Sequence, residues 1–131
     1  MNIKIKPIGT AIFLLAVFSF SSCKIKELPS PISSSKLTQQ YYLYENRVDR
    51  RYYNERIQVQ GIMSQVTRDK NNNLVVILAR KNDAYGVKCI FSKSASQHKT
   101  PLELQHRVVV EGKCRGIRRH VILENCKFIE N

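Results

Sequence analysis

The chain has 131 residues, enough for one folded domain with a leader segment and too few for two ordinary domains. Its 22 Lys and Arg against 10 Asp and Glu give a formal charge of +12, which favours polyanionic partners such as nucleic acid, phosphorylated lipid headgroups or acidic proteins. The alternative is that this charge only keeps a solvated surface soluble.

The first 22 residues have the pattern of a secretory signal peptide. Two lysines lie in a short cationic start, and residues 8–20 form an apolar run that is too short for a membrane-spanning helix. Small serines then directly precede Cys23. This arrangement resembles the cleavage box of bacterial lipoproteins, although Phe20 stands where leucine is usual. The resemblance implies that Cys23 becomes the acylated first residue of the mature chain and anchors it in the membrane. A plain secretory signal with an incidental cysteine is the alternative.

Lys24 follows Cys23, so the aspartate that retains some lipoproteins in the inner membrane is absent. We therefore expect a lipid-anchored protein of the cell envelope, held in the outer membrane and facing the periplasm. Residues 23–35 contain two prolines and four serines and are expected to form a flexible tether. The folded domain is expected over residues 36–131.

An amphipathic helix is predicted for residues 36–54, with Ser35 as its N-cap. The residues of its apolar stripe recur at helical spacing: Leu37, Tyr41, Tyr44, Val48 and Tyr52. Tyrosines beside arginines also suit stacking on single-stranded bases. The stripe favours the other interpretation, in which the helix docks on the domain with its tyrosine hydroxyls at the rim.

Three strands are predicted to follow. Residues 57–66 alternate apolar and polar side chains, and Gly61 in mid-strand indicates a bulge or bend. A polar turn over residues 68–73 leads to an apolar strand, Leu74–Ala79, which is expected to be buried on both faces or covered by the helix. Tyr85–Ser92 is the third strand, with alternate side chains pointing inward.

The end of the chain is predicted to form a short helix and a hairpin. Thr100, Pro101 and Glu103 are typical of a capped helix start. Arg107–Cys114 and His120–Phe128 alternate as strands around a short basic turn near Ile117–Arg118. The order of helix, three strands, short helix and two strands predicts a mainly β fold: a five-stranded OB-fold Greek-key barrel preceded by an N-terminal helix.

Several segments match one known family: Asn46, Tyr53–Gly61 (YNERIQVQG), Val87–Phe91 (VKCIF), Val108–Gly116 (VVVEGKCRG) and Leu123–Cys126 (LENC). From about Tyr44 onward the chain resembles the tRNA-anticodon-binding-like OB-fold family, which includes many short lipoproteins. One departure is Gln105-His106-Arg107, where relatives carry a glycine turn. The resemblance implies an OB fold and no established activity.

Three cysteines remain after Cys23, and an exported protein meets an oxidising compartment. Within the last hairpin, Cys114 and Cys126 are predicted to lie about 16 Å apart, too far for a disulfide. Cys89 and Cys126 are a candidate disulfide because the third and fifth strands of an OB barrel close beside each other. Buried thiols are the slightly favoured alternative.

Neither a metal site, a cofactor nor catalysis is expected from the sequence. No C-x-x-C pair is present, and the three histidines are isolated in predicted turns. The chain also lacks a glycine-rich phosphate loop and a nucleophile elbow, so we expect a protein that is not an enzyme.

The remaining candidate site is a basic surface. OB-folds bind through their second and third strands and the flanking loops. This geometry predicts a ligand-binding cluster of Arg68, Lys70, Lys88, Arg115, Arg118, Arg119 and His120. The predicted ligand is an envelope protein or an anionic lipid or glycan headgroup, bound without catalysis. Single-stranded nucleic acid is the alternative, although only Tyr85 at an edge and the inward Phe91 offer aromatic rings on those strands.

Overall fold

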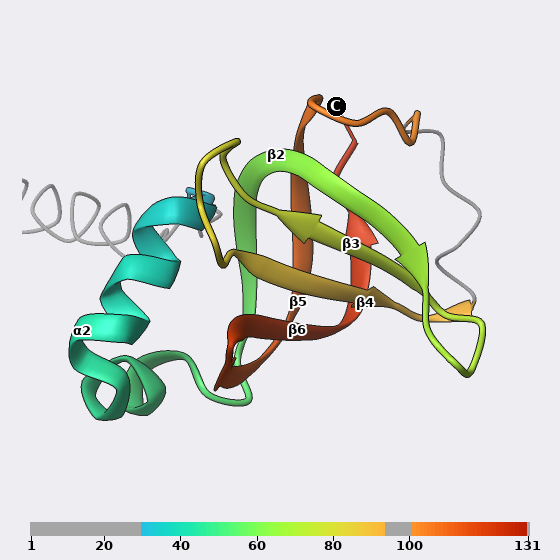
Figure 1. Ribbon diagram of the computed structural model, residues 1–131. Coiled ribbons are helices and arrows are strands. Elements are labelled where there is room, and N and C mark those ends of the chain that lie inside the picture. The colour runs from blue at the N-terminus through green and yellow to red at the C-terminus, as the bar shows by residue number, and fades with distance from the viewer. Residues whose placement is uncertain (1–29, 94–100, 131) are drawn as a thin grey trace, which may run out of the picture.

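The computed structural model describes residues 30–93 and 101–130 (Figure 1). The predicted signal peptide, Cys23, most of the tether and Thr100 lie outside the described residues. The elements in chain order are β1 (Ile32–Ser33), α2 (Ser34–Tyr52), β2 (Arg56–Arg68), β3 (Leu74–Leu78), β4 (Val87–Phe91), β5 (Arg107–Arg118) and β6 (His120–Phe128).

Five of these strands close into a barrel, which confirms the predicted OB-fold. The hydrogen-bonded order is β2-β3-β4-β6-β5, and β5 pairs again with β2 to complete the circle. The β4–β6 pair is parallel, whereas the other four pairs of the barrel are antiparallel. Beside the closed barrel, the short strand β1 pairs with β2 in parallel.

The barrel is filled by alternate residues of β2, β4, β5 and β6, as the period-two pattern predicts. Val87, Cys89 and Phe91 of β4 are all buried, and the Phe91 ring stacks on Phe128 of β6 at 4.5 Å between centroids. All of β3 except the half-buried Ile77 is buried, so the apolar strand is covered on both faces, as expected. The buried side chains of the barrel strands therefore form one core cluster with those of α2.

Helix α2 docks on the barrel through Leu37, Tyr41 and Val48, which are buried as expected. Tyr44 departs from the predicted stripe. Its backbone is non-helical (φ −141°, ψ 53°), which breaks the 3.6-residue period and leaves its side chain 53% exposed, within 5.2 Å of the Arg47 guanidinium. The stripe therefore consists of two short helical pieces joined by a kink.

A short strand precedes the helix, and the helix begins at Ser34, two residues before its predicted start. Ile32 and Ser33 pair with Val59 and Gln60 as β1, and Ser33, rather than Ser35, occupies the N-cap position of α2. This packing explains Gly61, because a Cβ there would collide with the Ser34 side chain. The irregularity of the strand lies farther along, between Met63 and Gln65.

The prediction of a short helix after Thr100 is wrong for the described residues 101–106, which form no helix. The Gln105 N–H donates to the Met63 carbonyl oxygen (2.7 Å), and the Met63 N–H donates to the His106 carbonyl oxygen (2.9 Å). These bonds extend the pairing along β2, and a positive φ of 72° at Gln105 turns the chain into β5. Backbone groups that pair with a strand are not free to close a helical turn.

Candidate binding surface at the β5–β6 turn

The predicted basic cluster is divided by the fold into three parts. Arg115 lies along β5, where its guanidinium contacts Glu124 (3.4 Å), donates a hydrogen bond to Asn54 and lies 5.2 Å from the Tyr53 ring centroid. These internal partners hold Arg115 on the side of the barrel. The structure therefore does not bring it into the turn with the other cations.

Arg68 and Lys70 belong to the β2–β3 turn, which is organised by Asp69. Its Oδ1 accepts hydrogen bonds from the backbone N–H groups of Asn71 and Asn73, both at 2.9 Å. The Asn73 N–H bond is the main cause that lowers the pKa of the Asp69 carboxyl, and the charge of Lys88 adds to it. Asp69 therefore stays ionised and offsets part of the positive charge at this turn.

The third part gathers Lys88, Arg118, Arg119 and His120. Lys88 of β4 pairs with Ile122 of β6, two residues beyond His120, and Arg118 pairs with His120 across the turn. Arg119 forms the turn itself with a positive φ of 66°, one residue beyond the predicted turn. Burial lowers the pKa of His120, and the nearby charges of Lys88 and Arg119 lower it further. We call Lys88, Arg118, Arg119 and His120 the turn cluster.

The ring of His120 is held in one orientation. Its Nδ1 accepts a hydrogen bond from the Gly86 N–H at 3.0 Å, and an accepting Nδ1 places the proton of the neutral ring on Nε2. The adjacent strand contact, from the Val121 N–H to the Gly86 carbonyl oxygen (3.0 Å), joins the start of β6 to the start of β4. The turn cluster is thus fixed to the barrel by backbone bonds.

Two exposed tyrosines border the turn cluster, and sequence reasoning did not assign them to the site. The rings of Tyr42 and Tyr85 lie 5.7 Å apart at 35°, and Tyr85 makes an edge contact with His120 at 6.0 Å. The Tyr42 hydroxyl donates to the Arg119 carbonyl oxygen at 2.8 Å. Tyr42 is 52% exposed and Tyr85 is 40% exposed. The available signal was that Tyr42 lies off the apolar stripe, but its contact with Tyr85 depends on the fold.

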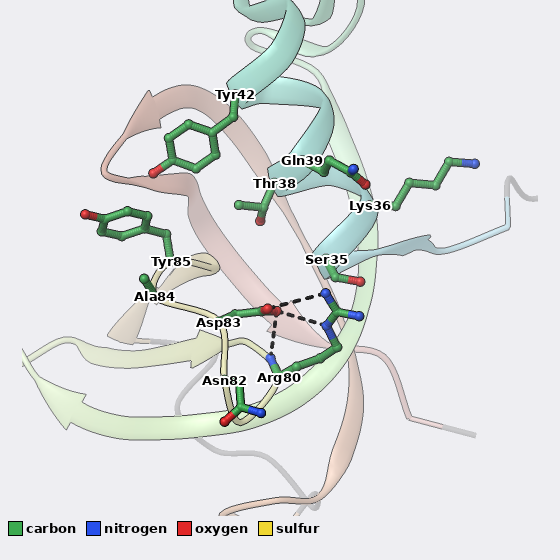
Figure 2. Close-up of a pocket in the computed structure, with 10 residues that line it drawn as sticks. All are labelled: Ser35, Lys36, Thr38, Gln39, Tyr42, Arg80, Asn82, Asp83, Ala84 and Tyr85. Atoms are coloured by element: carbon green, nitrogen blue, oxygen red, sulfur yellow. Dashed lines mark hydrogen bonds and ion pairs between the residues drawn. The ribbon is translucent and has the colours of Figure 1, made fainter.

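The same two tyrosines separate two open hollows. One hollow, of about 490 Å³, lies between α2 and the β3–β4 loop (Figure 2). The other, of about 430 Å³, lies toward the turn and is lined by Tyr41, Glu45, Ile117 and Arg119 besides the shared pair. Tyr42 and Tyr85 therefore lie between the first hollow, which we call the polar hollow, and the turn cluster.

Two findings concern other chemistry. Cys89, Cys114 and Cys126 are buried free thiols in this structure, and no group of three metal-ligating side chains occurs among the residues it describes. No helix in the described part of the chain is long and apolar enough to span a membrane.

A closed five-stranded barrel of this order, with a basic turn between its last two strands, is an OB-fold domain. The chain belongs to the tRNA_anti-like family, which matches residues 12–128. Among solved structures it is similar to a lipoprotein from Klebsiella pneumoniae subsp. pneumoniae that is named for nucleic-acid binding. The identity is 13% and the TM-score 0.63, and the match covers 79% of this chain and 100% of the other, so this likeness shows the fold. No curated protein matches the chain.

Proposed function

We propose that this protein is a lipid-anchored, non-catalytic binding module of the cell envelope, and that its turn cluster holds a single-stranded nucleic acid. The observation that carries the proposal is the juxtaposition of Arg119 and His120 with the exposed rings of Tyr42 and Tyr85. Proteins that bind single strands combine cations for the phosphates with aromatic rings for the bases. The name of the similar Klebsiella lipoprotein supports the same ligand class.

The charge of the turn cluster sets the expected strength of binding. Lys88, Arg118 and Arg119 are three cations around one turn, and Arg118 and Arg119 are exposed. Each phosphate contact on a single strand contributes about −0.7 to the slope of log K against log salt concentration, so three contacts predict a slope of about −2. The affinity is therefore expected to be moderate and to fall as the salt concentration rises.

A second candidate ligand is an envelope protein or an anionic lipid or glycan headgroup. The predicted signal peptide and Cys23 favour it, because an exported domain is separated from intracellular nucleic acid. These ligands also satisfy a cluster of cations, but they carry no unpaired bases to stack on the two exposed aromatic rings. The two candidates therefore differ in whether the unpaired bases of the ligand contribute to affinity.

The test is a titration of the mature chain carrying Cys23→Ser with a labelled single-stranded oligonucleotide at several salt concentrations. Arg118→Ala/Arg119→Ala should weaken binding and reduce the salt slope by about 1.4, since two phosphate contacts are lost. Lys113→Ala/Lys127→Ala is the matched control: it removes two charges farther along the same hairpin and should change the slope little. Binding to phosphatidylglycerol vesicles with no affinity for the oligonucleotide would support the second candidate instead.

The anchor has a separate test in intact cells. The protein with Cys23 should fractionate with membranes, and Cys23→Ser should release it into the soluble fraction of the envelope. Crosslinking of the anchored protein, followed by identification of the captured species, then distinguishes a nucleic acid from an envelope protein. Continued membrane association of Cys23→Ser would contradict lipidation as the cause of anchoring.

A further inference from the structure

We propose that Tyr42 and Tyr85 form a base-stacking site at the junction of α2 with the barrel, and that the polar hollow beside them receives one unpaired nucleobase. This inference rests on the proposed nucleic-acid function and assigns its base-binding residues. It places the site beside the N-terminal helix, away from the outer face of β3 and β4 through which OB-folds bind.

The outer face of β3 and β4 is poorly suited to stacking. Its half-buried side chains are Ile77 on β3 and Lys88 and Ile90 on β4, with Ile122 beside them on β6. Aliphatic side chains lack the flat π-face on which a base stacks, so this strip provides apolar contact and one charge. The exposed rings of the described chain that lie nearest the turn cluster are those of Tyr42 and Tyr85.

The two rings are already oriented in the free protein. The Tyr42 hydroxyl donates a hydrogen bond to the Arg119 carbonyl oxygen of the turn, and the Tyr85 ring makes an edge contact with the His120 ring. Side chains fixed before binding lose little conformational entropy when the ligand arrives. Their exposed faces are therefore available to a base at small cost.

The polar hollow offers groups that match a base edge. Figure 2 shows Gln39 on α2 and Asn82 in the β3–β4 loop on opposite sides of it, and each amide carries both hydrogen-bond donors and an acceptor. The Arg80 guanidinium is directed by Asp83, with contacts of 3.1 and 3.3 Å. The volume of the hollow, about 490 Å³, falls within the range of roughly 300–1,000 Å³ typical of small-ligand sites.

The positions of the cation and the aromatic ring match those of the phosphate and the base in a single strand. Arg119, which contacts phosphate in the proposed function, is bonded through its carbonyl oxygen to the same Tyr42 whose ring lines the hollow. Arg119 and Tyr42 also line the same second hollow, so the cation and the aromatic ring lie close together, as phosphate and base do within a nucleotide. A lipid headgroup or a polyanionic peptide presents the charge without the flat ring.

The experiment compares two probes of equal charge: oligo-dT and an abasic oligonucleotide of the same length. The full mature chain carrying Cys23→Ser should bind oligo-dT at least tenfold more tightly than the abasic strand. Tyr42→Ala and Tyr85→Ala should each weaken oligo-dT binding by about tenfold, within the range measured for base–aromatic stacking. Tyr85→Ala, which keeps the bond between Tyr42 and Arg119, should leave the salt slope and the affinity for the abasic strand unchanged.

Three variants and one signal complete the design. Tyr44→Ala removes a tyrosine that is 53% exposed and outside the hollow, and should bind like the parent protein. Tyr85→Phe keeps the ring and should retain binding. Tyr42→Phe keeps the ring but loses the bond to Arg119, so it should weaken binding less than Tyr42→Ala does. The chain has six tyrosines and no tryptophan, so quenching of tyrosine fluorescence by oligo-dT reports stacking directly.

The outcomes separate this inference from the proposed function. Equal affinity for oligo-dT and the abasic strand, with a normal salt slope, would overturn the stacking site and leave charge-driven binding in place. Binding of oligo-dT that is insensitive to both tyrosine substitutions would likewise overturn the site. Failure to bind either strand would overturn the proposed nucleic-acid function together with the inference.

Discussion

The Tyr41 hydroxyl lies 3.2 Å from Sγ of Cys114, in a hydrogen bond across the interface between α2 and β5. Both residues are completely buried, so this tyrosine is part of the core and not at the rim, where its hydroxyl was expected. Burial raises the pKa of Tyr41 far above its ordinary value, and the neighbouring side chains of Cys114 and Asp49 raise it further. The hydroxyl therefore stays protonated and fixes the helix to one place on the barrel.

The first prediction concerns this contact. Tyr41→Phe removes the hydroxyl and leaves the Cys114 thiol without that partner, so we expect a loss of about 1 kcal/mol in the free energy of unfolding. Tyr41→Ala also empties the volume of the ring and should cost about 3–5 kcal/mol. Urea denaturation followed by circular dichroism measures both. Tyr44→Phe, at an exposed position, is the control and should be near neutral; equal effects of Tyr44→Phe and Tyr41→Phe would contradict the assigned role.

The second prediction tests why a glycine lies in the middle of β2. An added Cβ at Gly61 would lie 2.9 Å from the Ser34 Cβ and 3.0 Å from the Leu78 Cβ. Gly61→Ala should therefore displace the start of α2 and cost about 1–3 kcal/mol. Ser34→Gly removes the nearest obstacle, so the double variant should cost less than the sum of the two single changes. Simple additivity in this double-mutant cycle would show that the close approach to Ser34 is not the cause.

The barrel could be predicted from sequence because β2, β4, β5 and β6 alternate with period two and β3 is apolar throughout, and a closed barrel buries the apolar residues of every strand. Val108, Val110 and Cys114 are buried as expected for this reason. The prediction of a short helix failed because Pro101 and Glu103 are only local signals for the start of a helix. The pairing of Gln105 and His106 with Met63 is a contact between distant parts of the chain, and it overrides them.

The candidate binding site could be predicted only in part. Arg118, Arg119 and His120 of the turn cluster follow from the position of the last hairpin, and Lys88 follows from the predicted strand before it. Arg115 was misplaced in the cluster because Asn54 and Glu124 compete for it, and both lie on other elements. Tyr42 was missed because helical spacing indicates which face is buried, whereas its partner Tyr85 is 43 residues away and meets it only in the folded barrel.

The third prediction is a pH dependence that arises from His120. Its pKa is lower in the folded protein than the ordinary value of about 6.5, so the unfolded chain binds more protons between the two values. Stability should therefore rise with pH across this window and stay constant above it. Protonation also requires Nδ1, which would end the hydrogen bond from Gly86. Melting temperatures of the parent and of His120→Gln, measured from pH 5 to 8, should converge toward low pH; parallel curves would exclude His120 as the titrating group.

The fourth prediction concerns the two barrel thiols on neighbouring strands. Cys89 pairs with Leu123 and Phe91 pairs with Cys126, so Cys89 and Cys126 lie on the neighbouring strands β4 and β6, and both side chains are fully buried. Burial, together with the hydrogen bond to Cys126, raises the pKa of Cys89 well above its ordinary value. Because the thiolate is the reactive form, oxidation of the folded barrel should be slow and should accelerate when mild denaturant opens it.

Under an oxidising glutathione buffer, the protein carrying Cys23→Ser should pass from three titratable thiols to one, with Cys114 the remaining thiol. Closing the loop between residues 89 and 126 should then stabilise the domain by up to about 4 kcal/mol, because the unfolded chain loses conformational entropy. Cys114→Ala is the matched control and should still form the disulfide, whereas Cys89→Ala should not. Three titratable thiols after prolonged oxidation, counted in denaturant, would show that the pair serves as small apolar packing, in line with the free thiols of this structure.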